Sequence, residues 1–270
     1  WAGIYQQLDT ASEAGPALVV TRSMIRDNTS VGVRILGARA RLEGTAIVDT
    51  LPNPNNQAEG FGVSVLSGEP PAQAAGVELV GCAITGNTNR GVVIEGGSLD
   101  MDTTAVADTR TSELLASGAP ADPTSGRGIV IARHAATKLR GTASVRGSLV
   151  ARNRDAGIAV FGSDVEIEAT VLEGTRPTPG STGVGLGLLA SVASGTTERA
   201  SVTVRASLVT GNVGIGVAVT GADLTVEDTR IEKTLANESP DHARLGLGAA
   251  ALTELVSQEA GNCPKDGKKP

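Results

Sequence analysis

A repeat of 22 residues constrains this chain more than any other feature. Four Asn residues recur in matching contexts, and each is followed 22 residues later by a Thr. The four pairs are Asn28 with Thr50, Asn87 with Thr109, Asn153 with Thr175 and Asn212 with Thr234. A fixed short period indicates a solenoid, because one such unit cannot bury its apolar face until other units stack on it.

The residues before each of these eight landmarks follow one pattern. The third, eighth and tenth residues back are apolar, and the fifth is small. Period-2 alternation of this kind predicts short strands rather than helices. We therefore predict a coil of about 22 residues that carries three strands, with successive coils stacked about 4.8 Å apart. The third residues back should form one inward column: Ile25, Ile47, Ile84, Val106, Val150, Leu172, Val209 and Ile231.

The pattern Ser-x-Ile-x-x-Asn-x-x-x-Gly-Val-x-Val resembles the repeat of the pectin-lyase-like superfamily over about residues 1–250. The resemblance implies an all-β fold, a right-handed single-stranded parallel β-helix of about eight to nine coils. In that family an Asn ladder stacks inside the turn between the second and third sheets. The residues that match this position are Asn28, Asn87, Asn153 and Asn212.

The repeat also predicts the domain organisation. Residues 1–255 are expected to form the β-helix, and residues 256–270 a polar tail that contains Cys263. Gly3 lies 25 residues before Asn28, as Gly62 lies 25 residues before Asn87, so we expect the chain to begin in mid-coil as a fragment of a longer protein.

Longer connections recur on alternate coils. The segment between each Thr and the next strand is longer than the segment after each Asn, and it is rich in Pro. A second set of excursions covers residues 67–76, 132–142 and 190–200. Variable loops on a rigid scaffold often carry binding, although solenoid loops also drift in length without a function.

Composition excludes several functions. The chain has 23 basic and 29 acidic residues, a net charge of −6, which disfavours nucleic acid as a partner. No apolar run approaches the roughly 18 residues that a membrane helix needs. The only aromatic residues are Trp1, Tyr5, Phe61 and Phe161, which disfavours a sugar-binding cleft. The isolated His134 and His242 suggest no catalytic constellation.

One group of acidic residues is a candidate metal site. Outward positions on neighbouring coils carry Glu43, Glu78, Asp100 and Asp102, with Arg41 beside them. Crowded carboxylates repel one another unless a cation joins them, and oxygen ligands suit Ca²⁺. Solvated surface acids are the alternative, and no other cofactor is expected.

The resemblance adds a possible chemistry for this cluster. In pectate lyases the site lies on the outer face of the strand that precedes the ladder turn, and we expect the cluster to occupy that sheet. There, carboxylates hold Ca²⁺ while an Arg or Lys abstracts the proton next to the uronate. Arg41 is the matching candidate base.

A second outward column alternates in sign along the stack. It reads Asp102, Arg146, Glu168, Arg205 and Glu227, which predicts a ladder of surface ion pairs.

Three functions fit these observations. The first is a non-enzymatic secreted or cell-surface scaffold that binds a ligand, with a glycan or another cell-surface component as the candidate, through its loops. The second is a polysaccharide lyase or another carbohydrate-active enzyme. The third is a structural spacer within a larger surface protein. The scarcity of aromatic and His residues disfavours the enzyme, and the varied loop lengths disfavour the spacer.

Overall fold

The structure, a computed structural model, describes residues 2–7, 18–55, 58–68, 75–112, 125–179, 183–236 and 246–252. This part of the chain contains 25 strands, arranged in three parallel sheets, and no helix. Trp1, His242, Cys263 and the predicted tail lie outside the described residues.

Sheet A has nine strands: β1 (Ala2–Gln7), β4 (Val31–Leu36), β7 (Phe61–Leu66), β10 (Arg90–Glu95), β13 (Arg127–Ala132), β16 (Ala156–Phe161), β19 (Gly185–Ser191), β22 (Gly214–Thr220) and β25 (Leu247–Leu252). Sheet B has eight: β2 (Leu18–Thr21), β5 (Arg39–Glu43), β8 (Gly76–Val80), β11 (Ser98–Asp102), β14 (Thr142–Arg146), β17 (Asp164–Glu168), β20 (Ser201–Arg205) and β23 (Asp223–Glu227). Sheet C has eight: β3 (Met24–Arg26), β6 (Ala46–Val48), β9 (Ala83–Thr85), β12 (Ala105–Ala107), β15 (Leu149–Ala151), β18 (Val171–Glu173), β21 (Leu208–Thr210) and β24 (Arg230–Glu232).

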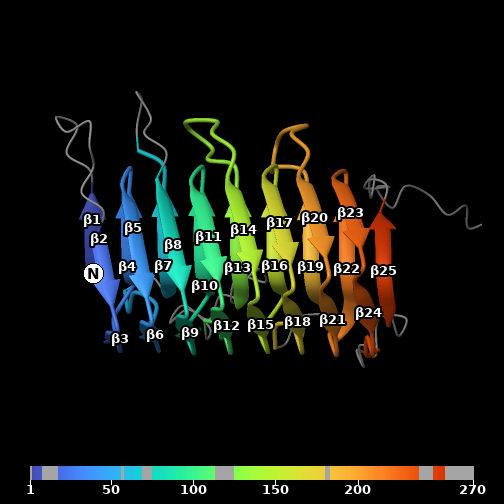
Figure 1. Ribbon diagram of the computed structural model, residues 1–270, viewed down its shortest axis with the longest axis horizontal. Coiled ribbons are helices and arrows are strands. Elements are labelled where there is room, and N and C mark those ends of the chain that lie inside the picture. Colours follow the sequence, from blue (N-terminus) through green and yellow to red (C-terminus); the bar gives the residue numbers. More distant parts are fainter. Residues whose placement is uncertain are drawn as a thin grey trace, which may run out of the picture.

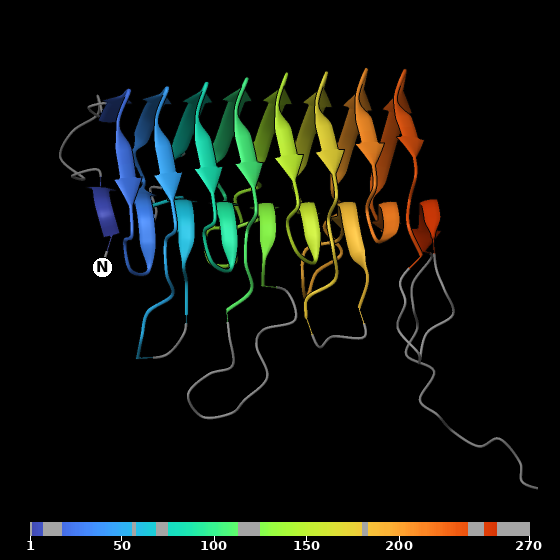
Figure 2. The ribbon, with the colours of Figure 1, turned by 90° about the horizontal axis from the view of Figure 1, so that it is seen from below.

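Each coil runs through sheets A, B and C in that order and then enters the next strand of sheet A. Each strand pairs only with the equivalent strands of the preceding and following coils, as in β4, β7 and β10. The coils therefore stack along one axis, which runs horizontally in Figure 1 and Figure 2. The predicted right-handed parallel β-helix is confirmed.

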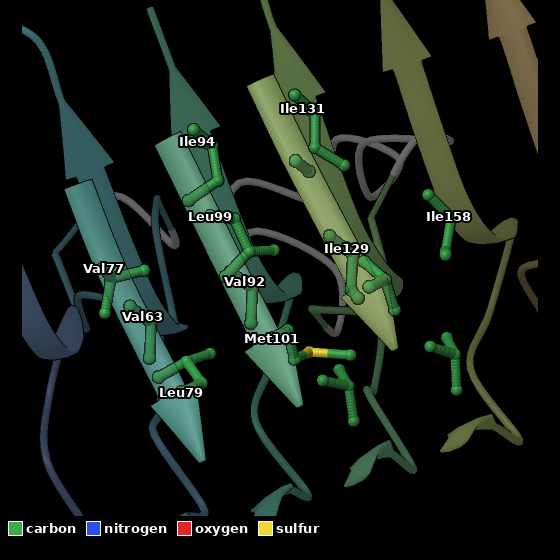
Figure 3. Packing of buried hydrophobic residues seen from close by; sticks show 14 of the residues in the cluster. Val63, Val77, Leu79, Val92, Ile94, Leu99, Met101, Ile129, Ile131 and Ile158 are labelled. Atoms are coloured by element: carbon green, nitrogen blue, oxygen red, sulfur yellow. The ribbon is translucent and has the colours of Figure 1, made fainter. Parts of the chain in front are cut away.

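Aliphatic side chains from all three sheets fill the interior. Figure 3 shows side chains of sheet A, such as Val63 and Val92, beside those of sheet B, such as Leu79 and Met101. The predicted inward column is confirmed: Ile47, Ile84 and the next four members are fully buried, and Ile231 is partly buried against the core. The described core contains no aromatic residue.

The corner between sheets C and A joins consecutive coils through Asn side chains. Nδ2 of Asn153 donates to the carbonyl of Val106 at 3.2 Å, and Oδ1 accepts from the amide of Thr109 at 3.1 Å. Asn87 and Asn212 make the same two bonds to the coil below them. Asn28, in the first coil, donates to Arg26 within its own turn. Each buried Asn therefore satisfies backbone groups of the Thr corner one coil earlier.

A second ladder runs along the corner between sheets B and C. At six of the eight landmarks, the small residue five places earlier supplies a hydroxyl that accepts a hydrogen bond from the amide of the equivalent residue one coil earlier. Six such bonds link Ser23 to Thr45, Cys82 to Thr104, Thr104 to Ser148, Ser148 to Thr170, Thr170 to Ser207 and Ser207 to Thr229. Cys82 is the one thiol in this series, and it donates to the carbonyl of Leu42. The uniform small residue of the repeat is thus a hydrogen-bonding position.

Across the residues that the structure describes, no helix has the length and apolar character needed to span a bilayer.

Candidate functional site

The predicted acidic cluster lies on the outer face of sheet B. Glu78 on β8 is aligned between Arg41 on β5 and Asp100 on β11, while Glu43 and Asp102 lie two residues further along their strands. This sheet is not the one that directly precedes the Asn turn, which is sheet C. Our expectation was wrong on this point because a short strand of three residues intervenes, and its pattern merges with that of sheet B in the sequence.

Arginines already engage three of these four carboxylates. Arg41 pairs with Glu78 and, at 3.1 Å, with Glu43. Arg146 reaches Asp100 at 2.6 Å. No three His, Cys, Asp or Glu side chains converge as metal ligands anywhere in the described ranges. Calcium binding by the cluster stays an untested hypothesis, and the ion pairs with Arg41 and Arg146 argue against it.

The candidate base Arg41 has the wrong electrostatic environment for proton abstraction. Its hydrogen bonds to Glu78 and then to Glu43 raise the pKa of the guanidinium above its ordinary value. A general base at neutral pH needs the opposite shift, toward the working pH. The structure therefore disfavours Arg41 as a base.

The alternating column on sheet B forms fewer ion pairs than its register suggests. Glu168 is aligned between Arg146 and Arg205, but Arg146 turns to Asp100 and Arg205 turns to Glu227 at 2.7 Å. The two guanidinium groups thus point away from the strand between them. A shallow hollow of about 50 Å³ remains, lined by Ser144, Arg146, Glu166, Ile167, Glu168, Thr203 and Arg205.

Sheet A carries a different surface, which the sequence did not reveal. Tyr5, Phe61 and Phe161 all belong to its strands, and none of them joins the core. The guanidinium carbon of Arg90 lies 5.3 Å from the centroid of Phe61, and that of Arg127 lies 5.2 Å from the centroid of Phe161. We call Tyr5, Arg34, Phe61, Arg90, Arg127 and Phe161 the A face.

The glycine after Phe61 explains why the ring points outward. A Cβ on Gly62 would lie 2.8 Å from both Nδ2 of Asn87 and Cγ2 of Ile84, so this residue faces the interior. Val63 also faces the interior, as part of the core. Two consecutive inward residues reverse the alternation of the strand, and Phe61 is therefore placed on the outer side.

Two ion pairs fix arginines of the A face. Arg34 pairs with Glu59, and both side chains are about one third exposed. Arg127 pairs with Asp155, and its side chain is only 11% exposed. Since Arg127 reaches Phe161 on the next coil, its side chain must cross the sheet near Val130 and Ala159, which are buried although they lie on the outer side.

The longer connections of alternate coils begin and end at the edge of this face. Residues 51–55 and 58–60 lead directly into Phe61, and residues 125–126 lead into Arg127. The central parts of these loops lie outside the described residues. The A face therefore lies beside the described ends of the loops for which the sequence predicted a binding role.

Two of the other excursions, residues 132–142 and 190–200, lie between sheets A and B (Figure 1), and each is linked to the next coil by an ion pair. Arg140 binds both carboxylate oxygens of Asp164, and Arg199 repeats this arrangement with Asp223 two coils later. Nδ1 of His134 accepts the amide of Thr137 in its own turn, so this His has a structural role.

Comparison with known proteins supports the fold. No protein-family model matches the chain, and no curated protein matches its sequence. Among solved structures, the A-module of the mannuronan C-5 epimerase AlgE6 from Azotobacter vinelandii is similar, with a TM-score of 0.52, 14% identity and 87% of this chain covered. The chain spans 58% of that module. The pectate lyase Pel9A matches with a TM-score of 0.43 and 14% identity, over 92% of this chain and 66% of its own. At this identity the likeness to the epimerase module supports the right-handed parallel β-helix fold alone.

Proposed function

We propose that this protein is a non-enzymatic β-helix scaffold of the cell surface or extracellular space that binds a glycan on its A face. The observation that carries the proposal is the placement of the rings. All three described aromatic residues lie outside the core, on one sheet, although burying a ring would contribute more to stability than any aliphatic residue of that core. Tyr5 is exposed and the two Phe rings are half-buried, and an apolar patch on the surface is informative about binding.

The chemistry of the A face suits a saccharide. Aromatic rings pack against the C–H surfaces of sugars, and the planar guanidinium of Arg donates several fixed hydrogen bonds to hydroxyl or carboxylate oxygens. Tyr5, which is 54% exposed, and Arg34 are aligned on neighbouring strands. A chain of sugars that lies along the helix axis would meet Tyr5 and then Arg34 on neighbouring coils, about 4.8 Å apart. Phe61, Arg90 and Arg127 form a second column, three residues earlier on their strands. The epimerase with the similar fold acts on mannuronan, which supports a polysaccharide as the ligand class.

Two observations favour binding without catalysis. The pKa values of Arg41, Arg140, Arg152 and Arg199 are raised by bonded carboxylates, which keeps these groups charged rather than tuning them as bases. Arg41, the candidate base, is also held in ion pairs with both Glu78 and Glu43.

Affinity electrophoresis in gels that contain alginate, polygalacturonate, pectin or a neutral glucan tests the proposal. We expect at least one glycan to retard the protein, and Tyr5→Ala and Arg34→Ala to weaken that retardation. Arg41→Ala is the matched control, because it removes an equally exposed Arg–Glu pair from sheet B. Retardation by none of the glycans, or equal losses in Arg34→Ala and Arg41→Ala, would contradict the proposal.

An ultraviolet assay for unsaturated products on the same acidic glycans tests the enzymatic alternative. We expect no release from any of them. Product that disappears in Arg41→Ala would establish a lyase on sheet B.

A further inference from the structure

The outer face of sheet C carries two columns of side chains that no function described so far uses. The column four residues before the landmarks reads Met24, Ala46, Ala83, Ala105, Leu149, Val171, Leu208 and Arg230. The column two residues before them reads Arg26, Val48, Thr85, Ala107, Ala151, Glu173, Thr210 and Glu232. We call these residues the C face. None of them belongs to the cluster that fills the interior, and Met24 is 64% exposed, but Ala107 and Ala151 are buried, so the accessible contacts come mainly from the first column.

The C face is complementary to itself in side-chain size. Its first half carries Ala46, Ala83 and Ala105, and its second half carries Leu149, Val171 and Leu208 in the same column. A two-fold axis that lies in the interface, parallel to the strands and between β12 and β15, would place the first strand opposite the eighth. Ala46 would then face Leu208, Ala83 would face Val171, and Ala105 would face Leu149. Each of these three larger side chains would meet an Ala, and at the two ends of the column Met24 would face Arg230.

The charges at the two ends are complementary under the same axis. The first coil ends in Arg26 and Asp27, which pair with each other at 2.7 Å, and the eighth ends in Glu232 and Lys233, whose charges lie 3.8 Å apart. The axis places Arg26 opposite Glu232 and Asp27 opposite Lys233. These side chains are largely exposed, apart from the one-third-exposed Glu232, so they can pair across an interface.

We propose that the C face is a homodimer interface in which two copies of this chain pack with antiparallel helix axes. Such an interface is isologous, so each contact between positions i and j occurs twice. The surface is about 34 Å long, from seven spacings of about 4.8 Å, and only two to three side chains wide. It is therefore smaller than the roughly 800 Å² per partner of a standard interface, and the dimer should dissociate in the micromolar range or above.

Exchanging a larger and a smaller side chain across the interface tests the pairing. Sedimentation equilibrium over a concentration series measures the dissociation constant. Wild type should show a monomer–dimer equilibrium. Ala83→Val places Val opposite Val at two symmetric contacts and should raise the dissociation constant about tenfold. Val171→Ala added to Ala83→Val exchanges the two sizes and should restore the wild-type constant. Thr203→Val, on the outer face of sheet B, is the control and should change nothing.

Disulfide cross-linking tests the direction of the two axes. In a Cys263→Ser background, Ala46→Cys combined with Leu208→Cys places one thiol on the second coil and one on the seventh, too far apart to bond within a chain. Mild oxidation should give covalent dimer, whereas Ala46→Cys alone should stay monomeric under denaturing conditions. Melting temperatures check that each variant folds.

Three outcomes would overturn the proposal. They are a monomer at all concentrations up to the millimolar range, a dimer that is indifferent to Ala83→Val, and efficient cross-linking by Ala46→Cys alone. The last result would place each coil opposite its own copy, which pairs Ala with Ala and removes the size argument.

Discussion

Nδ2 of Asn153 donates a hydrogen bond of 3.2 Å to the carbonyl of Val106, which lies 47 residues earlier in the chain and one coil lower in the stack. The bond is fully buried, and the same side chain also accepts from the next corner residue of that lower coil. One amide group therefore satisfies two backbone groups that have no water beside them.

Asn153→Ala should lower the free energy of unfolding by about 2–4 kcal/mol, because it leaves a buried carbonyl and a buried amide without partners. Asn55→Ala, in an exposed turn, is the control and should change it by less than about 0.5 kcal/mol. Urea denaturation measures both. Equal effects would show that the Asn corner does not contribute to stability beyond an ordinary turn.

Leu172→Asp should unfold the stack or fray its second half. Leu172 is fully buried in the inward column, where an unpaired carboxylate loses its hydration without a compensating partner. Circular dichroism and limited proteolysis detect the loss. Thr203→Asp, on the outer face of sheet B, should melt close to the wild-type temperature, and a Leu172→Asp variant that did the same would contradict the register.

Thr104→Val should destabilise the protein by about 1–3 kcal/mol, since it removes the acceptor of a buried amide while keeping the shape of the side chain. The lost bond is the 3.1 Å contact from the amide of Cys82 to Oγ1 of Thr104. Thermal unfolding measures the difference. An unchanged midpoint would mean that the hydroxyl ladder is a consequence of stacking and does not support it.

Calcium should leave the melting temperature unchanged, because arginines already neutralise Glu43, Glu78 and Asp100. Differential scanning fluorimetry with calcium and with a chelator tests this. A ligand that binds only the folded state raises the melting temperature by mass action. A rise that vanishes in the Asp100→Asn/Asp102→Asn variant would establish the calcium site that the sequence suggested.

The Arg199–Asp223 pair should contribute to the acid sensitivity of the fold. The hydrogen bond from Arg199 lowers the pKa of Asp223 below the usual carboxyl value of 3.8. A folded-state pKa below the unfolded one gives a stabilisation that is complete above 3.8 and is lost as the pH falls through the folded value. Asp223→Asn should therefore reduce the drop in melting temperature between about pH 5 and pH 2.

Glu166→Gln is the control for this effect, because Glu166 is exposed and takes part in no ion pair of the described chain. A pH profile of Asp223→Asn that matches wild type would show that solvent screens the pair completely.

The repeat predicted the fold and the strand register because each coil must align with its neighbours to share one interior. The offset of 22 residues, for example, correctly placed Ile25 beside Ile47. The same regularity identified Asn153 as a corner residue. It could not show that Thr104 and its equivalents form a hydrogen-bond ladder. The pattern of Ser and Thr could reflect a need for a small side chain as well as a need for a hydroxyl.

Surface geometry was less accessible from the sequence. The alternating pattern placed Arg146 beside Glu168 on the next strand. It could not show whether the long Arg side chain turns to the next strand or to the preceding one, and Arg146 pairs with Asp100 on the preceding strand. Alternation alone could not assign Phe61 to the outer face, because Gly62 and Val63 both face inward and reverse the alternation there. A column of Gly ahead of alternating strands is the signal that could have located the A face.

The alternation of Asn and Thr at one corner sets the step by which such a molecule can change its length. Each buried Asn bonds to a Thr corner below it, so the stack is built from interlocked pairs of coils. Removal of a single coil would place two like corners next to each other, whereas removal of a pair would preserve the alternation of Asn and Thr. During evolution, a protein of this kind should therefore gain or lose coils in pairs, which is about 44 residues plus the loops.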